Sequence, residues 1–202
     1  MTAIFETVRG NPENQDCGAI IRNGSSRVLV VADGAGGLSG GREAAVMVVD
    51  LVRQGAAALN SPESCVILLQ NADKAIARDR TAGETTCVLA VVTDDTVYGA
   101  SVGDSEAWLI CENGVTDFTK RQVRKPFLGS GRASPVGFSH KMGVGEKLLL
   151  ATDGLFKYTS PERIESVCRT SALGLVAKQL IELVRYPSGA MPDDVTIILG
   201  VK

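Results

Sequence analysis

Acidic residues stand at five boundaries where an apolar, strand-like run meets glycine or turn residues. They are Asp16, Asp33, Asp104, Asp153 and the pair Asp193-Asp194. Because strand ends from distant parts of a chain can converge on one edge of a sheet, these carboxylates can meet. Converging carboxylates repel and raise each other's pKa unless cations neutralise them. Oxygen ligands without histidine or cysteine select hard cations such as Mg²⁺ or Mn²⁺, and two such ions can activate water and bind a phosphoryl group.

Two other interpretations of these residues stay open from spacing alone. An aspartate beside glycine at a strand end is commonly a turn, and Asp94-Asp95 shows such a polar turn without glycine. The stretch GAGGLSGG at 34–41 follows Asp33 and precedes a helical segment, which is the order of a phosphate-binding loop. However, it matches neither GxGxxG nor GxxxxGK followed by Ser or Thr, and it contains no lysine. An aspartate at its mouth would also repel a bare phosphate.

Apolar periodicity predicts the elements that position these residues. Asn23-Gly24 between two apolar runs is typical of a hairpin. Helical spacing predicts a helix over 41–58, and Ser61-Pro62 predicts the start of a second that runs to about Arg80. The later helices are expected after Ser160-Pro161 and over 173–185. The expected strands are 18–21, 27–32, 85–93, 96–102, 105–111, 115–118, 147–152 and 195–201, with an irregular loop over 121–144.

The order of these elements predicts a layered α+β architecture. Residues 85–118 are expected to form a meander of antiparallel strands, because no helix separates them. Strands segregated from pairs of helices favour layers of sheet and helix. The chain has 202 residues and shows no repeat or linker, so we expect a single domain over 1–202.

Composition argues against several classes of function. The net charge of −2 provides no basic surface for nucleic acid, and no apolar run is long enough to cross a membrane. The first residues lack the order of a signal peptide. The single histidine, His140, excludes a His-rich metal site and argues against a Ser-His-Asp triad. Five scattered cysteines favour reduced thiols and a cytoplasmic protein.

Six stretches together resemble the metal-dependent type 2C protein serine/threonine phosphatases, in a compact bacterial-like form. They occur in the family's order and cover the chain from about residue 9 to its end. In sequence they are ENQDCGAII, VVADGAGGLSGGREAA, GETTCVLAVV, ASVGDSEAWLI, KLLLATDGLFKY and MPDDVTIILGV. The resemblance implies a four-layer αββα sandwich, in which two central antiparallel sheets are flanked by pairs of helices. This agrees with the order of elements expected from periodicity.

The resemblance also implies a metal centre of two Mn²⁺ or Mg²⁺ ions, with a third in some members. Asp33 would bridge two ions, and the carbonyl of Gly34 would bind one of them. Asp153 and Asp193 would hold the other ion. Asp104 would bind the weaker third ion together with Asp153. A water activated by two ions would then attack the phosphorus of phosphoserine or phosphothreonine in line, without a covalent enzyme intermediate.

Asp16 would orient the reacting water, and Arg9 is the candidate for binding the substrate phosphate. Arg9 lies about two residues farther from the NQD motif than the family's arginine does. Ala35 stands where some relatives have a histidine proposed as general acid. Glu106 replaces the arginine of the family's GDSR motif, and we expect only a consequence at the surface or in strand pairing. Asp194 replaces a frequent asparagine and adds a negative charge beside the cluster.

The resemblance implies phosphorylated protein substrates and an opposing serine/threonine kinase, for a protein that we expect to be a monomer. The segment between Asp117 and Val144 is shorter than the flap-bearing region of many relatives. Its basic residues could meet an acidic or phosphorylated partner or simply form a solvated loop. Those residues are Arg121, Arg124, Lys125 and Arg132. The alternative function is a pseudophosphatase, which would keep the fold as a regulatory binding module with weak metal sites.

Overall fold

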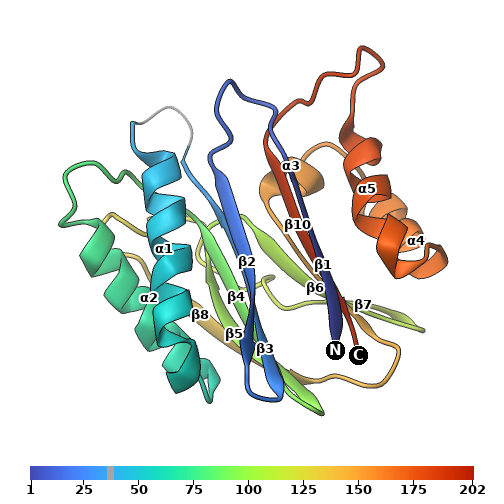
Figure 1. Ribbon diagram of the computed structural model, residues 1–202, viewed down its shortest axis with the longest axis horizontal. Helices are drawn as coiled ribbons and strands as arrows, with labels where there is room; N and C mark the ends of the chain where they lie inside the picture. Colours follow the sequence, from blue (N-terminus) through green and yellow to red (C-terminus); the bar gives the residue numbers. More distant parts are fainter. Residues whose placement is uncertain (36–38) are drawn as a thin grey trace.

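The computed structural model describes residues 1–35 and 39–202. Two five-stranded antiparallel sheets pack face to face, and helices cover the outer face of each (Figure 1). Side chains of both sheets, such as Leu29 and Leu109, fill the space between them. The predicted α+β four-layer sandwich is therefore confirmed. No helix in the described ranges is long and apolar enough to span a membrane.

The first sheet carries the predicted Asn-Gly hairpin. In spatial order its strands are β2 (Asp16–Asn23), β3 (Ser26–Asp33), β4 (Cys87–Val92), β5 (Thr96–Val102) and β8 (Val136–Lys141). Asn23 pairs with Ser26, so the hairpin prediction is confirmed. Residues 87–92 are buried throughout, as expected for a strand covered by helices on one side and by the other sheet on the other.

The second sheet shows that the predicted meander was wrong in part. In spatial order its strands are β1 (Thr2–Val8), β10 (Val195–Val201), β9 (Lys147–Ala151), β6 (Glu106–Cys111) and β7 (Gly114–Asp117). β4 pairs with β5 and β6 pairs with β7 as expected. However, the chain leaves the first sheet after β5 and enters the second at β6, so these two strands do not pair. Gly103, with φ of 107°, makes the turn between the sheets, a conformation that glycine adopts without steric cost.

The prediction of an irregular loop over 121–144 was also wrong in part, because β8 lies inside it. β8 is an edge strand whose side chains are mostly exposed, and only Val136 and Phe138 alternate as apolar positions, which is too short a pattern to predict a strand. Its partner is β5, and Val97 of β5 pairs with His140 of β8. The single histidine is thus exposed on a strand and not in a loop.

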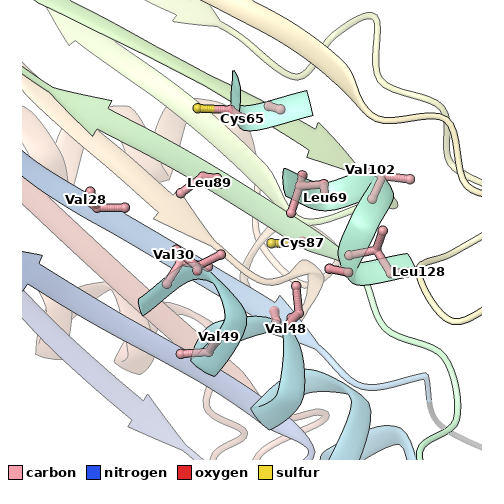
Figure 2. Packing of buried hydrophobic residues seen from close by; sticks show 14 of the residues in the cluster. Val28, Val30, Val48, Val49, Cys65, Leu69, Cys87, Leu89, Val102 and Leu128 are labelled. Atoms are coloured by element: carbon pink, nitrogen blue, oxygen red, sulfur yellow. The ribbon is translucent and has the colours of Figure 1, made fainter. Parts of the chain in front are cut away.

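Helices α1 (Gly41–Gly55) and α2 (Pro62–Ile76) cover the first sheet. The side chains of Val48, Val49 and Leu69 pack onto the sheet beside Val30 and Leu89 (Figure 2). The predicted helix over 41–58 ends as a short 3₁₀ turn, η1 (Ala56–Ala58). The side chains and backbones of Ser61 and Ser64 exchange hydrogen bonds and so cap α2, as predicted, but α2 ends at Ile76 and not at about Arg80.

Helices α4 (Pro161–Thr170) and α5 (Leu173–Val184) cover the second sheet, together with the unpredicted short helix α3 (Asp153–Phe156). α4 has the predicted proline in its first turn, although the side chain of Ser160 makes no capping hydrogen bond. α3 begins at Asp153, with only Thr152 between it and the end of β9, so the chain changes direction there. Apart from Asp16, which begins β2, the predicted aspartates therefore lie at the connections β3–α1, β5–β6 and β9–α3 and in the segment before β10.

Candidate metal centre

A cavity of about 370 Å³ lies where these connections meet. Five residues predicted to bind metal line it: Asp33, Gly34, Asp104, Asp153 and Asp193. They come from four segments that are far apart in the sequence. The fold thus brings together side chains that the spacing of the sequence could only suggest as a cluster. Asp194 also lines the cavity, whereas Asp16 is only 7% exposed and is not among the residues that line it.

Asp16 begins β2 and lies directly opposite Asp33, the last residue of β3. Its Oδ2 accepts a hydrogen bond of 2.8 Å from Oγ1 of Thr152, which itself accepts one of 2.9 Å from the backbone N–H of Thr196. Its Oδ1 is buried and has no hydrogen-bond partner among the described atoms. Burial raises the pKa of Asp16 to about 7, and nearby carboxylates add to the effect.

The backbone of Asp33 is fixed by two threonines that directly precede β4. Its carbonyl accepts hydrogen bonds from Oγ1 of Thr85 at 2.8 Å and from the N–H of Thr86 at 2.9 Å. Its N–H donates to Oγ1 of Thr86, which bonds Oγ of Ser105 at 2.7 Å. All three hydroxyl-bearing residues are buried. This network holds the strand ends of both sheets in one arrangement around the cavity.

Burial raises the pKa of the Asp33 carboxyl to about 9. The negative charges of the neighbouring carboxylates act in the same direction, with that of Asp16 foremost. Burial likewise raises the pKa of Asp104, and the charge of Asp153 contributes. The protein therefore assembles carboxylates where their ionised forms are unfavourable without a compensating cation.

Two glycines allow backbone segments to approach closely at the cavity. A Cβ on Gly34 would overlap the backbone of Gly41 at the start of α1. A Cβ on Gly154 would overlap the carbonyl oxygen of Asp194. The glycine after each aspartate is therefore required by packing, whatever its carbonyl binds. Residues 36–38 of the stretch considered as a phosphate loop lie outside the described residues.

Lys157 is a cavity residue that the sequence analysis missed. Its Nζ lies 2.6 Å from Oδ2 of Asp153 and 3.9 Å from Oδ2 of Asp193. The hydrogen bond to Asp153 is the main cause that raises the pKa of Lys157. The available signal was its position four residues after Asp153, because residues at that spacing share one face of a helical turn.

Asp194 is buried and holds the loop before β2. Its Oδ1 accepts hydrogen bonds from the N–H groups of Gly10 and Asn11 at 2.7 and 3.1 Å, and its Oδ2 accepts one from Gln15 at 2.9 Å. The side-chain amide of Asn11 also donates to Oδ1 of Asp193 at 3.2 Å. The extra carboxylate expected at Asp194 therefore accepts hydrogen bonds from three backbone N–H groups.

Arg9 does not lie at the cavity. Its guanidinium donates to the carbonyl of Pro12 at 3.3 Å on the exposed surface of the loop. Among the described residues, the cationic side chains that line the cavity are Lys125 and Lys157. Glu106 accepts a hydrogen bond of 2.8 Å from the indole of Trp108, a contact within β6, which fits the local consequence expected for the GDSE sequence.

The residues present fit hard divalent cations by the chemistry of their donors. The described residues that line the cavity offer carboxylate oxygens and include no histidine or cysteine, and such donors suit Mg²⁺ and Mn²⁺. The partnerless Oδ1 of Asp16 and the raised pKa of Asp33 both indicate groups that lack a positive partner. Over 1–35 and 39–202, no three Asp, Glu, His or Cys side chains are gathered closely enough to hold an ion. Two of the candidate ligands, Asp153 and Asp193, instead share Lys157.

Comparison with known proteins places this geometry in a family. The sequence pattern of stage II sporulation protein E (SpoIIE) matches residues 23–200. No curated protein sequence matches the chain. A solved bacterial serine phosphatase is 25% identical, with a TM-score of 0.86 over 100% of this chain and 97% of its own. The serine/threonine phosphatase Stp1 from Staphylococcus aureus is 24% identical, with a TM-score of 0.85 over 99% and 94%.

A further solved structure is the catalytic domain of the serine/threonine protein phosphatase PstP in complex with two manganese ions. It is 21% identical and has a TM-score of 0.83 over 98% of this chain and 96% of its own. The bacterial serine phosphatase at 25% identity supports phosphatase function, whereas Stp1 and PstP, which are less similar in sequence, support the fold. Because the family match extends over most of the chain, the protein belongs to the SpoIIE family and so to the type 2C phosphatases that its motifs resemble.

Proposed function

We propose that this protein hydrolyses phosphoserine and phosphothreonine in protein substrates, with two Mn²⁺ or Mg²⁺ ions as cofactors. The observation that carries the proposal is the convergence of Asp33, Asp104, Asp153 and Asp193 on one cavity. Each comes from a separate connection, so the formation of local turns does not explain why the four carboxylates meet at one cavity. A carboxylate cluster of this kind in a type 2C fold supports metal-dependent phosphate chemistry over simple turn formation.

Asp33 and the carbonyl of Gly34 would hold one ion, and Asp33 would share the other with Asp153 and Asp193. Asp104 would contribute with Asp153 to a third ion. Bound ions of this kind supply an activated water at neutral pH and neutralise charge on the phosphoryl group. The buried network of Thr85, Thr86 and Ser105 would keep Asp33 in a fixed position while substrate binds.

Asp16 would act as the residue that orients the attacking water. Thr152 fixes Oδ2 of this carboxylate, while Oδ1 stays without a partner and can accept a hydrogen bond. We expect the enzyme to work as a monomeric single domain over 1–202 in the cytoplasm, opposite a serine/threonine kinase. The pseudophosphatase alternative has less support, because the aspartates proposed as core ligands are all present at the cavity.

Hydrolysis of p-nitrophenyl phosphate with Mn²⁺, with Mg²⁺ and with EDTA tests the proposal. We expect activity with either ion and none with EDTA. Asp153→Asn should reduce kcat/KM by roughly a hundredfold or more, since loss of even an outer partner of a metal ligand typically costs 10–100-fold. Asp94→Asn changes an exposed aspartate in the β4–β5 turn and should leave the rate unchanged. A wild-type protein without activity under all three conditions contradicts the proposal.

Peptides that carry phosphoserine, phosphothreonine or phosphotyrosine then test the substrate class. We expect release of phosphate from the first two and little from the third. Faster hydrolysis of the phosphotyrosine peptide would refute the proposed specificity without refuting phosphatase activity.

A further inference from the structure

The connection between β7 and β8 contributes Lys125 and Phe127 to the lining of the cavity, and its backbone is fixed on both sides of Lys125. On one side, the carbonyl of Val123 accepts a hydrogen bond of 3.0 Å from the N–H of Gly103. Gly103 directly precedes Asp104, which lines the cavity. This end of the connection is therefore tied to the turn that carries one of the candidate ligands.

On the other side, Leu128 and Thr85 exchange two backbone hydrogen bonds, of 2.9 and 3.0 Å. Thr85 also forms a bridge with Gly34, so this end is tied to the segment that follows Asp33. Leu128 is fully buried. The backbone from 123 to 128 is thus held against the cavity at both ends, and the position of Lys125 is set by the fold.

Asp73 of α2 secures the continuation of this connection. Its buried carboxylate accepts hydrogen bonds from the N–H groups of Gly129, Gly131 and Ala133 at 2.8, 2.9 and 3.1 Å. A buried carboxylate with three charge-assisted hydrogen bonds is a strong anchor. It fixes a loop that has little regular structure of its own.

Lys125 lines the cavity and is exposed to solvent. Its Nζ lies 5.3 Å from the centroid of the Phe127 ring, and it makes no ion pair with the described carboxylates. Lys157 differs, because it is paired with Asp153 at 2.6 Å. Lys125 is therefore the cavity cation whose charge no described protein group neutralises.

We propose that Lys125 binds the phosphoryl group of the substrate at the mouth of the cavity, in place of Arg9. The inference rests on the proposed phosphatase function. A phosphomonoester is an anion, and a cavity lined by carboxylates repels it. A lysine ammonium is an effective point charge for phosphate oxygens. Nζ of Lys125 would donate hydrogen bonds to oxygens that do not take part in bond breaking.

The test compares Lys125→Gln with Lys120→Gln, a matched change of an exposed lysine in the same connection that does not line the cavity. With p-nitrophenyl phosphate and Mn²⁺, we expect Lys125→Gln to raise KM roughly tenfold and to change kcat less than about twofold, because a contact made equally in ground and transition states affects KM alone. Lys120→Gln should match the wild type. Lys125→Arg should restore most of the affinity, since it keeps the charge.

A second measurement does not depend on turnover. Calorimetric titration of the full chain with inorganic phosphate, in the presence of Mg²⁺, should show equal affinity for the wild type and Lys120→Gln. The affinity of Lys125→Gln for phosphate should be roughly tenfold lower. Thermal unfolding of each variant should match the wild type, which would exclude a general loss of structure.

The outcomes separate the two proposals. An active wild type whose KM is the same in Lys125→Gln overturns the role of Lys125 and leaves phosphatase function intact. An inactive wild type that binds phosphate through Lys125 supports this inference and refutes the proposed function. Equal phosphate binding by an inactive wild type and by Lys125→Gln, or none by either, overturns the inference.

Discussion

Asp16 and Asp33 lie directly opposite each other on β2 and β3, where the antiparallel register makes them a cross-strand pair. Side chains paired in this way have Cβ atoms about 4.5–5.5 Å apart, and like charges at such positions destabilise a sheet. Both carboxyls have a raised pKa because both are largely withdrawn from water. The fold therefore holds a repulsive pair in a fixed place, which is an arrangement that cations can stabilise.

We predict that, in the presence of EDTA, the protein becomes less stable as the pH rises from about 4 to 9. The folded pKa of Asp33 is about 9 and that of Asp16 about 7, whereas an unfolded aspartate has a pKa of about 3.9. Between these values the folded state binds more protons than the unfolded state, so the free energy of unfolding falls with pH. The contribution of these two protonated carboxyls to the free energy of unfolding is complete below pH 4. It is lost as the pH rises past their folded pKa values.

Thermal unfolding from pH 5 to pH 9 measures this effect. Asp33→Asn should show a flatter dependence on pH, because it removes the carboxyl with the higher pKa. Mn²⁺ should oppose the loss at high pH, because ions bind the deprotonated carboxylates. A midpoint that stays constant or rises with pH in EDTA would show that these carboxyls do not titrate as described.

A second prediction concerns Lys157, whose ammonium lies between Asp153 and Asp193. Lys157→Met should lower stability in EDTA by about 0.5–1 kcal/mol, since the lysine side chain is 55% exposed and such pairs contribute little. The same change should strengthen Mn²⁺ binding several-fold, because the ion no longer competes with an ammonium. Calorimetric titration with Mn²⁺ checks this, with Lys157→Arg as the control that keeps the charge. Weaker Mn²⁺ binding by Lys157→Met would contradict the prediction.

Local signals were sufficient to place the candidate aspartates at strand ends, and the resemblance to the type 2C phosphatases then implied which of them bind metal. Asp33 ends a strand of buried apolar residues, and β10 spans 195–201 as predicted, directly after Asp193-Asp194. The residues that signal a strand end, a turn at glycine or a helix start at serine lie within a few residues of the feature that they predict. The order of the motifs then predicted the four layers.

What the sequence could not show depends on contacts between distant segments. The strands β5 and β6 are both almost entirely buried, so their apolar patterns do not indicate that they belong to different sheets. The edge strand β8 is mostly exposed and gives little periodic signal. The roles of Asp194 and Lys157 likewise depend on partners brought near only by folding.

A third prediction follows from the three hydrogen bonds that the Asp194 carboxylate accepts from backbone N–H groups. Asp194→Asn leaves one acceptor oxygen and places an amide group against an N–H, so a buried donor loses its partner. We expect a loss of stability of about 1–3 kcal/mol. Chemical denaturation measures it, and Asp50→Asn on the exposed face of α1 provides the control. A stability equal to that of the wild type would show that the loop does not depend on this carboxylate.

The last prediction concerns Asp73, which lies on α2 away from the cavity and acts on it through the loop at 129–133. Asp73→Ala leaves the N–H groups of Gly129, Gly131 and Ala133 without their acceptor, and we expect a loss of stability of about 3 kcal/mol. If this loop positions Lys125, the same variant should raise KM for p-nitrophenyl phosphate several-fold at a temperature where it remains folded. Gln70→Ala, on the exposed face of the same helix, should change neither quantity. A destabilised Asp73→Ala with an unchanged KM would mean that the two hydrogen bonds between Leu128 and Thr85 suffice to hold Lys125 in place.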